Sequence, residues 1–158
     1  MTRSARVDLA QTARRVADLD ALWRPLIRFD PITRYYARLD LDADYEAWLL
    51  TWLPGQGTAW HDHGDSSGSF IVLEGRLTEE VGARPVGGEL HCSGIATHHR
   101  PGSQRTFGSS YLHKVTNNDV EPAVSLHLYS PALTQMNEYV EVDGLLEAVY
   151  LQRVGQHW

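Results

Sequence analysis

Residues 55–75 decide the fold of this chain, and they read GQGTAWHDHGDSSGSFIVLEG. In an extended strand, alternate side chains face the same side, so His61 and His63 can both reach one metal ion. Two polar residues on a solvated strand face would give the same pattern, which makes the pair alone a weak signal. Glycines at both ends of the stretch indicate turns. We therefore expect short strands here, with His61 and His63 as candidate metal ligands.

Short apolar runs recur on both sides of this stretch, separated by glycine, proline or asparagine turns. They occupy residues 45–53, 70–73, 77–81, 89–92, 111–115 and 122–129. Such regular spacing predicts a mainly β fold, either a sandwich or a barrel. We expect the barrel to cover residues 44–142, with residues 139–142 as a strand and the segment after them either strand or helix. Residues 96–110 have no periodicity and are expected to form a surface loop.

The first thirty residues have a helical pattern instead. Between Val7 and Trp23 the apolar residues fall mostly three or four apart, and Pro25 ends the pattern. We find no internal repeat, low-complexity tract or linker. The expectation is one domain over residues 1–158, with a helical segment at 1–30.

Composition excludes several classes of protein. The chain has 158 residues and a formal net charge of -6, the wrong sign for binding nucleic acid or a polybasic membrane surface. No stretch approaches ~18 consecutive apolar residues, and no apolar segment follows the first charges, so we expect neither membrane span nor secretory signal and a cytoplasmic location. The single cysteine, Cys92, can form neither an intramolecular disulfide nor a cysteine-built zinc site. A small molecule is the expected partner.

A second alternating pattern lies near the end of the predicted barrel. Ser125, His127 and Tyr129 share one face of a strand, with leucines on the other. They could form a solvated face or a hydrogen-bonded relay, and spacing does not distinguish these. The remaining histidines are not assigned to a site; they are His91, His98, His99 and His157.

Two motifs resemble those of the cupin superfamily. Gly55-x5-His61-x-His63-x11-Gly75 resembles the first cupin motif, and His113-x3-Asn117 resembles the second. The resemblance implies a cupin-type β-barrel (jelly roll) in which His61, His63 and His113 bind one metal ion. The glutamate usual shortly after the second histidine is absent, because Ser67 and Gly68 occupy those places. Three neutral imidazoles suit iron, zinc or nickel.

Residues 121–131, EPAVSLHLYSP, closely resemble a signature stretch of the cysteine dioxygenase family. With the cupin motifs, this resemblance extends from about Arg34 to Pro131. It implies Fe(II) on the three histidines, an outer relay of Ser125, His127 and Tyr129, and oxidation of L-cysteine by O2 to cysteine sulfinic acid. Mammalian members carry a cysteine that crosslinks to the relay tyrosine. Gly68 stands at that place, as in bacterial-type members, which implies that no crosslink forms.

Tyr36-Ala37-Arg38 resembles the family's Tyr-x-Arg element. The resemblance implies that Arg38 binds the substrate carboxylate and that Tyr36 hydrogen-bonds the relay phenol. A guanidinium offers a rigid fork of donors that matches a carboxylate. Without the resemblance, Arg34 and Arg38 would be interpreted as exposed charges, the usual role of arginine, and the resemblance reverses this for Arg38.

Two alternatives to a cysteine dioxygenase stay open. One is a 3-mercaptopropionate dioxygenase, a relative that tends to lose the arginine. The other is a non-catalytic or isomerase-type metal-binding cupin, in which the relay would be idle. A monomer or small homo-oligomer fits either case.

Overall fold

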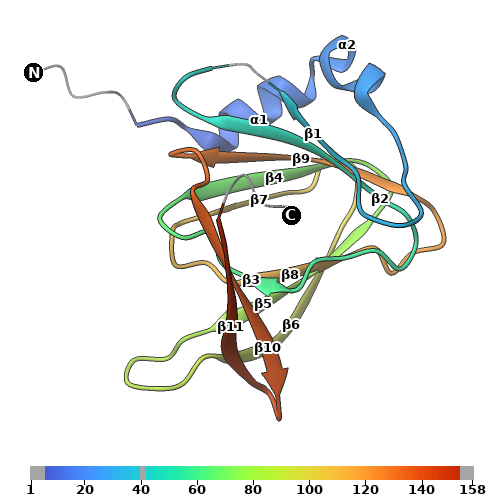
Figure 1. The fold of residues 1–158 in the computed structure, drawn as a ribbon. Helices are drawn as coiled ribbons and strands as arrows, with labels where there is room; N and C mark the ends of the chain where they lie inside the picture. The colour runs from blue at the N-terminus through green and yellow to red at the C-terminus, as the bar shows by residue number, and fades with distance from the viewer. Residues whose placement is uncertain (1–5, 40–41, 154–158) are drawn as a thin grey trace, which may run out of the picture.

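A computed structural model of the chain describes residues 6–39 and 42–153. The N-terminal part forms two short helices, α1 (Leu9–Ala17) and α2 (Asp20–Trp23), and a 3₁₀ turn at Arg24–Leu26. Strands follow to the end of the described chain (Figure 1): β1 (Tyr36–Leu39), β2 (Glu46–Trp52), β3 (Trp60–His61), β4 (Ser67–Glu74), β5 (Leu77–Ala83), β6 (His91–His99), β7 (Gln104–Phe107), β8 (His113–Thr116), β9 (Ala123–Ser130), β10 (Gln135–Val142) and β11 (Leu145–Arg153). The prediction of a mainly β fold is confirmed.

The strands form two layers that face each other. One is a sheet with strand order β1-β2-β9-β4-β7, and the other closes through its pairings as β10-β11-β6-β5-β8-β3. Figure 1 shows the helices lying on the outer side of the first layer. The space between the layers therefore receives side chains from both.

The helical segment covers the first sheet through one apolar face. Asp8 caps α1 by accepting a hydrogen bond from the Gln11 backbone N–H at 3.0 Å. Leu9, Ala13 and Val16, spaced as one helical face requires, are buried in a cluster shared with strand residues. The predicted helical pattern is interrupted near residues 18–19. Its second part is only the short helix α2 and the 3₁₀ turn that contains Pro25.

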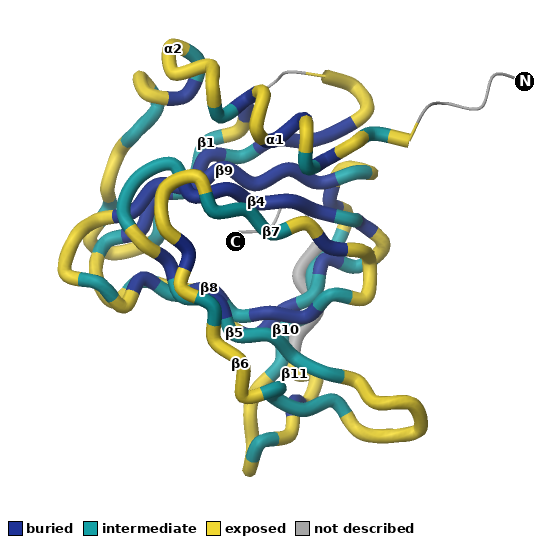
Figure 2. The backbone as a smooth tube through the Cα atoms, turned by 180° about the vertical axis from the view of Figure 1, so that it is seen from behind, coloured by how far each residue is buried: buried dark blue, intermediate teal, exposed yellow. Residues whose placement is uncertain are grey.

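Strand β9 separates two cores because its side chains alternate. Leu126 and Leu128 face the helices and belong to the same cluster as α1. Ser125, His127 and Tyr129 face the opposite way, into the space between the layers. Figure 2 shows that β9 and its neighbour β4 are buried along most of their length. The polar face of β9 is therefore an internal surface rather than a solvated one.

The prediction of a surface loop at residues 96–110 is wrong in part. Strand β6 extends to His99, and β7 occupies Gln104–Phe107. These strands pair with β5 and β4, and several β6 side chains are exposed. An exposed strand face carries no apolar alternation, which is why periodicity did not indicate these strands.

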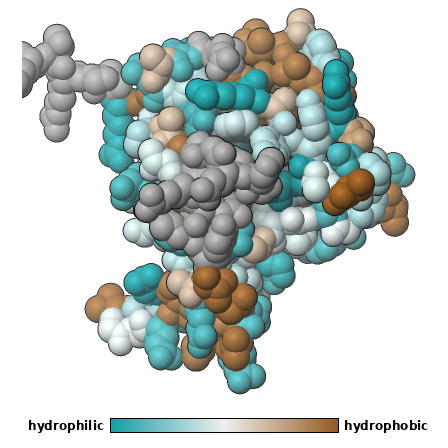
Figure 3. Space-filling view, viewed as in Figure 1, coloured by the Kyte–Doolittle hydropathy of each residue, from teal (hydrophilic) through white to brown (hydrophobic). Residues whose placement is uncertain are grey.

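The C-terminal segment forms a hairpin of β10 and β11. Strands therefore lie on both sides of the range 44–142, from Tyr36 to Arg153. The hairpin projects from the barrel and carries exposed Val140, Val142 and Leu145. Figure 3 shows apolar surface at this projecting end of the molecule. No helix in the described part of the chain is both long and apolar enough to span a membrane.

Candidate active site

The three predicted metal ligands come together between the layers. His61 on β3 and His113 on β8 are direct partners across the strand pair, and His63 follows two residues later. One ring nitrogen from each lies within 4.8 Å of the others, and all three side chains are buried. These residues form a group of three histidines that could hold one metal ion.

The residue between the first two histidines points the other way and fixes their segment. Asp62 accepts hydrogen bonds from the Asn137 amide at 3.0 Å and from the Tyr139 hydroxyl at 2.7 Å, both on β10. It also accepts one from the backbone N–H of Gly64 at 3.0 Å. Gly64 has φ +57°, a conformation that glycine adopts without steric cost. Alternation and this turn together direct His61 and His63 inward.

The hydrogen bonding of the three rings fits a metal ion. His61 Nδ1 lies 2.9 Å from the Ala59 carbonyl oxygen, and His113 Nδ1 lies 2.7 Å from Glu79 Oε2, which leaves Nε2 of each ring available. Both ring nitrogens of His63 are buried without a partner. A buried polar atom without a partner costs about 1 to 3 kcal/mol, and a metal ion would satisfy one of them.

The protonation of these rings also suits ligation. Burial, helped by neighbouring His113, lowers the pKa of His61 to about 3. Burial likewise lowers the pKa of His63 well below its usual range, and that of His113 is lowered too. The rings are therefore neutral at physiological pH, as metal ligation requires.

The predicted relay is only partly connected by hydrogen bonds. Ser125 Oγ lies 2.8 Å from His127 Nε2, and the Trp52 indole N–H donates to Ser125 Oγ at 2.8 Å. Ser125 Oγ therefore links the Trp52 indole to the His127 ring. Among the described residues, no hydrogen bond joins His127 to Tyr129. The connected unit is thus Trp52–Ser125–His127, and Tyr129 stands beside it.

Tyr129 lies at the junction of the metal site and a small cavity. Its ring centroid is 5.3 Å from that of His63. On the other side it lines a cavity together with Arg34, Tyr36, Trp48 and Leu50. Burial raises the pKa of the Tyr129 phenol far above its usual range. The hydroxyl is therefore protonated at physiological pH and can act as a hydrogen-bond donor.

Two arginines of this region have different surroundings. Arg34 lines the cavity with Tyr129 and also a second depression that reaches His61. Its guanidinium carbon lies 4.6 Å from the centre of the Trp52 ring, and its Nε is buried without a partner. The side chain of Arg38, in contrast, is 55% exposed and lies 3.9 Å from Glu46. Arg38 lines neither depression. The geometry therefore favours Arg34, rather than the predicted Arg38, as the arginine placed to contact a bound carboxylate.

Gly68 lies directly opposite Tyr129 on the neighbouring strand. A Cβ atom built at this position would be 2.4 Å from Phe107 Cζ and 3.1 Å from Tyr129 Cδ1. The ring of Phe107 occupies the space that a side chain at position 68 would need. Phe107 also stacks on His63, with ring centroids 4.7 Å apart.

Sequence reasoning missed Arg34 and the buried carboxylate of Glu79, which contacts His113. Glu79 was detectable in principle, because it lies in phase with Leu77 and Val81 on a predicted strand and so faces inward. Of the histidines left unassigned, His91 and His98 lie outside the site, and His157 lies outside the described residues. His99 is buried and contacts Glu79.

Comparisons with known proteins agree with this architecture. The chain matches the family Cysteine dioxygenase type I over residues 3–142. It is 32% identical over 139 residues to "Cysteine dioxygenase type 1" of Danio rerio, covering 77% of this chain and 63% of the relative. The chain thus spans less than two thirds of that relative's length.

Two solved structures share the fold at lower identity. A Klebsiella pneumoniae protein with a double-stranded β-helix domain has TM-score 0.57 and 16% identity, and covers 80% of this chain and 93% of its own. A Cupin 2 conserved barrel domain protein from Salinispora arenicola has TM-score 0.51 and 18% identity, over 68% and 82% of the two chains. The fold is the predicted cupin barrel, and the chain belongs to the cysteine dioxygenase type I family.

Proposed function

We propose that this chain is a non-haem iron thiol dioxygenase that converts L-cysteine and O2 to cysteine sulfinic acid. The observation that carries the proposal is the position of Arg34. Its buried, unpartnered Nε belongs to a guanidinium that lines both the cavity of Tyr129 and the depression at His61. A carboxylate-binding group therefore stands next to a metal site, as a small thiol acid requires. Relatives named cysteine dioxygenase support the same chemistry.

The proposed reaction balances without a further reductant. The sulfur of the thiol is oxidised, both atoms of O2 become bonded to it, and the thiol proton ends on the sulfinic acid or in solvent. Fe(II), held by His61, His63 and His113, would supply the redox chemistry that joins O2 to sulfur. Three neutral imidazoles leave the positive charge of the ion available to a substrate thiolate.

Arg34 would hold the substrate carboxylate. A guanidinium presents two parallel N–H donors to a carboxylate, and such charge-assisted bonds strengthen when water is excluded. A cation–π contact with Trp52 would help to hold the guanidinium in place. The proposed protein is therefore an arginine-containing, bacterial-type member, with Arg34 in the role that the motif assigned to Arg38.

Tyr129 would donate a hydrogen bond at the reacting end of the substrate. The phenol is protonated because burial raises its pKa. The ring lies between the imidazole of His63 and the cavity of Arg34. His127 and Ser125 would support this wall of the pocket, and Tyr36 would complete the cavity around the substrate.

The test is oxygen uptake by protein loaded with Fe(II) under anaerobic conditions. L-cysteine, 3-mercaptopropionate and cysteamine are compared, with the product identified by mass spectrometry. We expect cysteine sulfinic acid in proportion to the O2 consumed, with cysteamine a poor substrate because it lacks the carboxylate. Preference for 3-mercaptopropionate would indicate the other thiol dioxygenase. Metal binding with no oxidation of any thiol would indicate a non-catalytic or isomerase-type cupin.

A further inference from the structure

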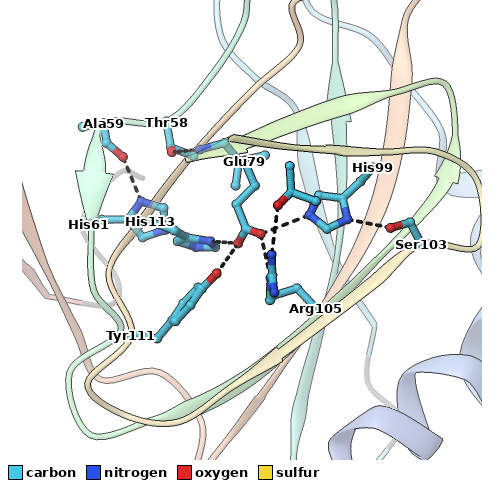
Figure 4. A network of polar contacts seen from close by, with 11 residues as sticks. Thr58, Ala59, His61, Glu79, His99, Ser103, Arg105, Tyr111 and His113 are labelled. Carbon is cyan, nitrogen blue, oxygen red and sulfur yellow. Dashed lines mark hydrogen bonds and ion pairs between the residues drawn. The ribbon is translucent and has the colours of Figure 1, made fainter. Parts of the chain in front are cut away.

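A carboxylate with no exposure to solvent lies behind the metal site. Glu79 on β5 is 0% exposed and is surrounded by four donors, shown in Figure 4. An ionised carboxylate is rarely buried unless charges or hydrogen bonds compensate for the lost hydration. A feature this costly needs an explanation beyond the filling of space.

The two oxygens of Glu79 have separate partners. Oε1 accepts hydrogen bonds from His99 Nε2 at 3.0 Å and from Arg105 Nε at 2.8 Å. Oε2 accepts from the Tyr111 hydroxyl at 2.7 Å and from His113 Nδ1 at 2.7 Å. One oxygen is therefore anchored by the fold, and the other holds a metal ligand.

The anchor on Oε1 joins the two layers of the barrel. His99 belongs to β6, in the same layer as Glu79, and its Nδ1 lies 2.6 Å from Ser103 Oγ. Arg105 belongs to β7, in the opposite sheet, and provides a permanent positive charge beside the carboxylate. These contacts fix the carboxylate before any metal binds. Because all the partners of Oε1 come from the chain itself, Glu79 does not depend on the metal for its position.

The contact on Oε2 determines how His113 can act. An ionised carboxylate only accepts hydrogen bonds, so His113 Nδ1 carries the proton and Nε2 presents its lone pair to the metal. A carboxylate partner also increases the electron-donating strength of a ligating imidazole. The three ligands differ in this respect. His61 Nδ1 contacts only the backbone carbonyl of Ala59, and both nitrogens of His63 lack a partner.

We infer that Glu79 is a positioning residue for the metal site. Glu79 selects the Nδ1–H tautomer of His113 and thereby raises the affinity of the three-histidine site for the metal ion. The metal site has no carboxylate ligand, but the negative charge of Glu79 lies on the far side of the His113 ring from the metal position. Glu79 itself does not ligate, because each oxygen already accepts two hydrogen bonds and the ligand cluster contains only the three histidines. The inference concerns metal binding and does not depend on the proposed oxidation of cysteine.

The test uses metal-free protein, with Co(II) as the metal probe. Glu79→Gln keeps the side-chain size but removes the charge and replaces one acceptor with a donor. We expect Co(II) to bind about 10- to 100-fold more weakly, the usual effect of losing a partner of a ligating histidine. The affinity is measured by competition with a chromophoric chelator. Nitrogen-15 NMR of the metal-free wild type should show the Nδ1–H tautomer of His113, and Glu79→Gln should show a mixture.

Two control variants separate positioning from general stability. Tyr111→Phe removes the other donor to Oε2 and keeps the ring, and His99→Gln disturbs the anchor on Oε1 without touching His113. Both should lose much less Co(II) affinity than Glu79→Gln, even where His99→Gln lowers the melting temperature. Equal losses in all three variants would reduce Glu79 to a structural role. If Glu79→Gln does not fold, the Nε2–H tautomer in metal-free wild type would by itself overturn the inference.

Discussion

The two sides of the metal site differ in how completely their polar atoms are bonded. On one side, the Nδ1 of His113 is bonded to Glu79, whose own oxygens are fully engaged. On the other side, both nitrogens of His63 and the Nε of Arg34 are buried without partners. Buried polar groups in native proteins are nearly always bonded, so exceptions require a cause. The bonded side provides the rigid frame, and the unbonded side is where metal and substrate would bind.

The largest effect should come from removing a ligand. His61→Ala, His63→Ala and His113→Ala each leave two imidazoles, too few donors for a stable divalent site. We expect the metal content of each variant to fall to background, measured by elemental analysis after anaerobic loading with Fe(II). His98→Ala is the matched control, because His98 lies outside the site and contacts Thr78 on the surface. Full metal content in His63→Ala would contradict the role of His63 as a metal ligand.

The next largest effect should come from removing the hydroxyl of Tyr129, which lies on the same side of the metal site as His63 and Arg34. Tyr129→Phe keeps the ring and its packing but removes the hydroxyl. If the phenol donates a proton or hydrogen bond during oxygen transfer, sulfinate formation should fall by about 10² to 10⁴. Metal content should stay at the wild-type level. Unchanged, fully coupled oxidation by Tyr129→Phe would leave the tyrosine with a packing role.

Local motifs predicted the cluster of three histidines but not the arginine that lines the cavity beside it. The spacing of His61 and His63 and the alternation around His127 are short-range properties, and the barrel keeps them. Arg34 and Arg38 are four residues apart on an extended segment, so alternation places both on one side. Which of them reaches the cavity depends on where β1 lies along β2, where Arg38 pairs with Trp48 at the exposed edge. The register between two strands depends on tertiary packing, which local sequence patterns do not reveal.

The Glu79 network was outside sequence reasoning for a similar reason. Its partners come from residues 99–113, and two of them, His99 and Arg105, lie in the segment predicted to be a loop. Strand β6 is recognisable only from its pairing with β5, which brings His99 opposite Leu77. The single domain, the cytoplasmic location and the monomer or small homo-oligomer stay predictions.

Acid should destabilise the metal-free protein. Burial lowers the pKa values of His61, His63, His113 and His127 in the folded state. The unfolded chain, with histidine pKa near 6.5, therefore binds more protons than the folded chain below that pH. Stability should be level above about pH 6.5 and fall below it, by up to about 1.4 kcal/mol per pH unit for each ring. For His61 this loss continues to about pH 3.

Urea unfolding across this pH range measures the effect. A second series on His127→Asn should show a shallower dependence of the free energy of unfolding on pH, because one buried neutral imidazole is removed. Equal stability of the metal-free wild type at about pH 5 and pH 7 would be inconsistent with neutral, buried imidazoles.

The smallest effect should come from added volume at Gly68. In Gly68→Ala the new Cβ would meet the ring of Phe107, so Phe107 must move against His63. Overpacking of this kind costs about 1 to 3 kcal/mol, and thermal unfolding can detect it. Gly108→Ala is the control, since a Cβ there meets nothing within 4 Å. If Gly68→Ala were as stable as Gly108→Ala, the contact with Phe107 would not constrain this position.

The central claim, that the buried and unpartnered Nε of Arg34 marks the substrate position, is tested most directly by comparing Arg34→Gln with Arg38→Gln. The measured quantity is kcat/KM for L-cysteine. Loss of a desolvated arginine–carboxylate pair costs roughly 2 to 4 kcal/mol, or about 30- to 1000-fold. We expect that loss in Arg34→Gln and near wild-type values in Arg38→Gln, with cysteamine affected by neither. A large loss in Arg38→Gln with Arg34→Gln unchanged would contradict the account.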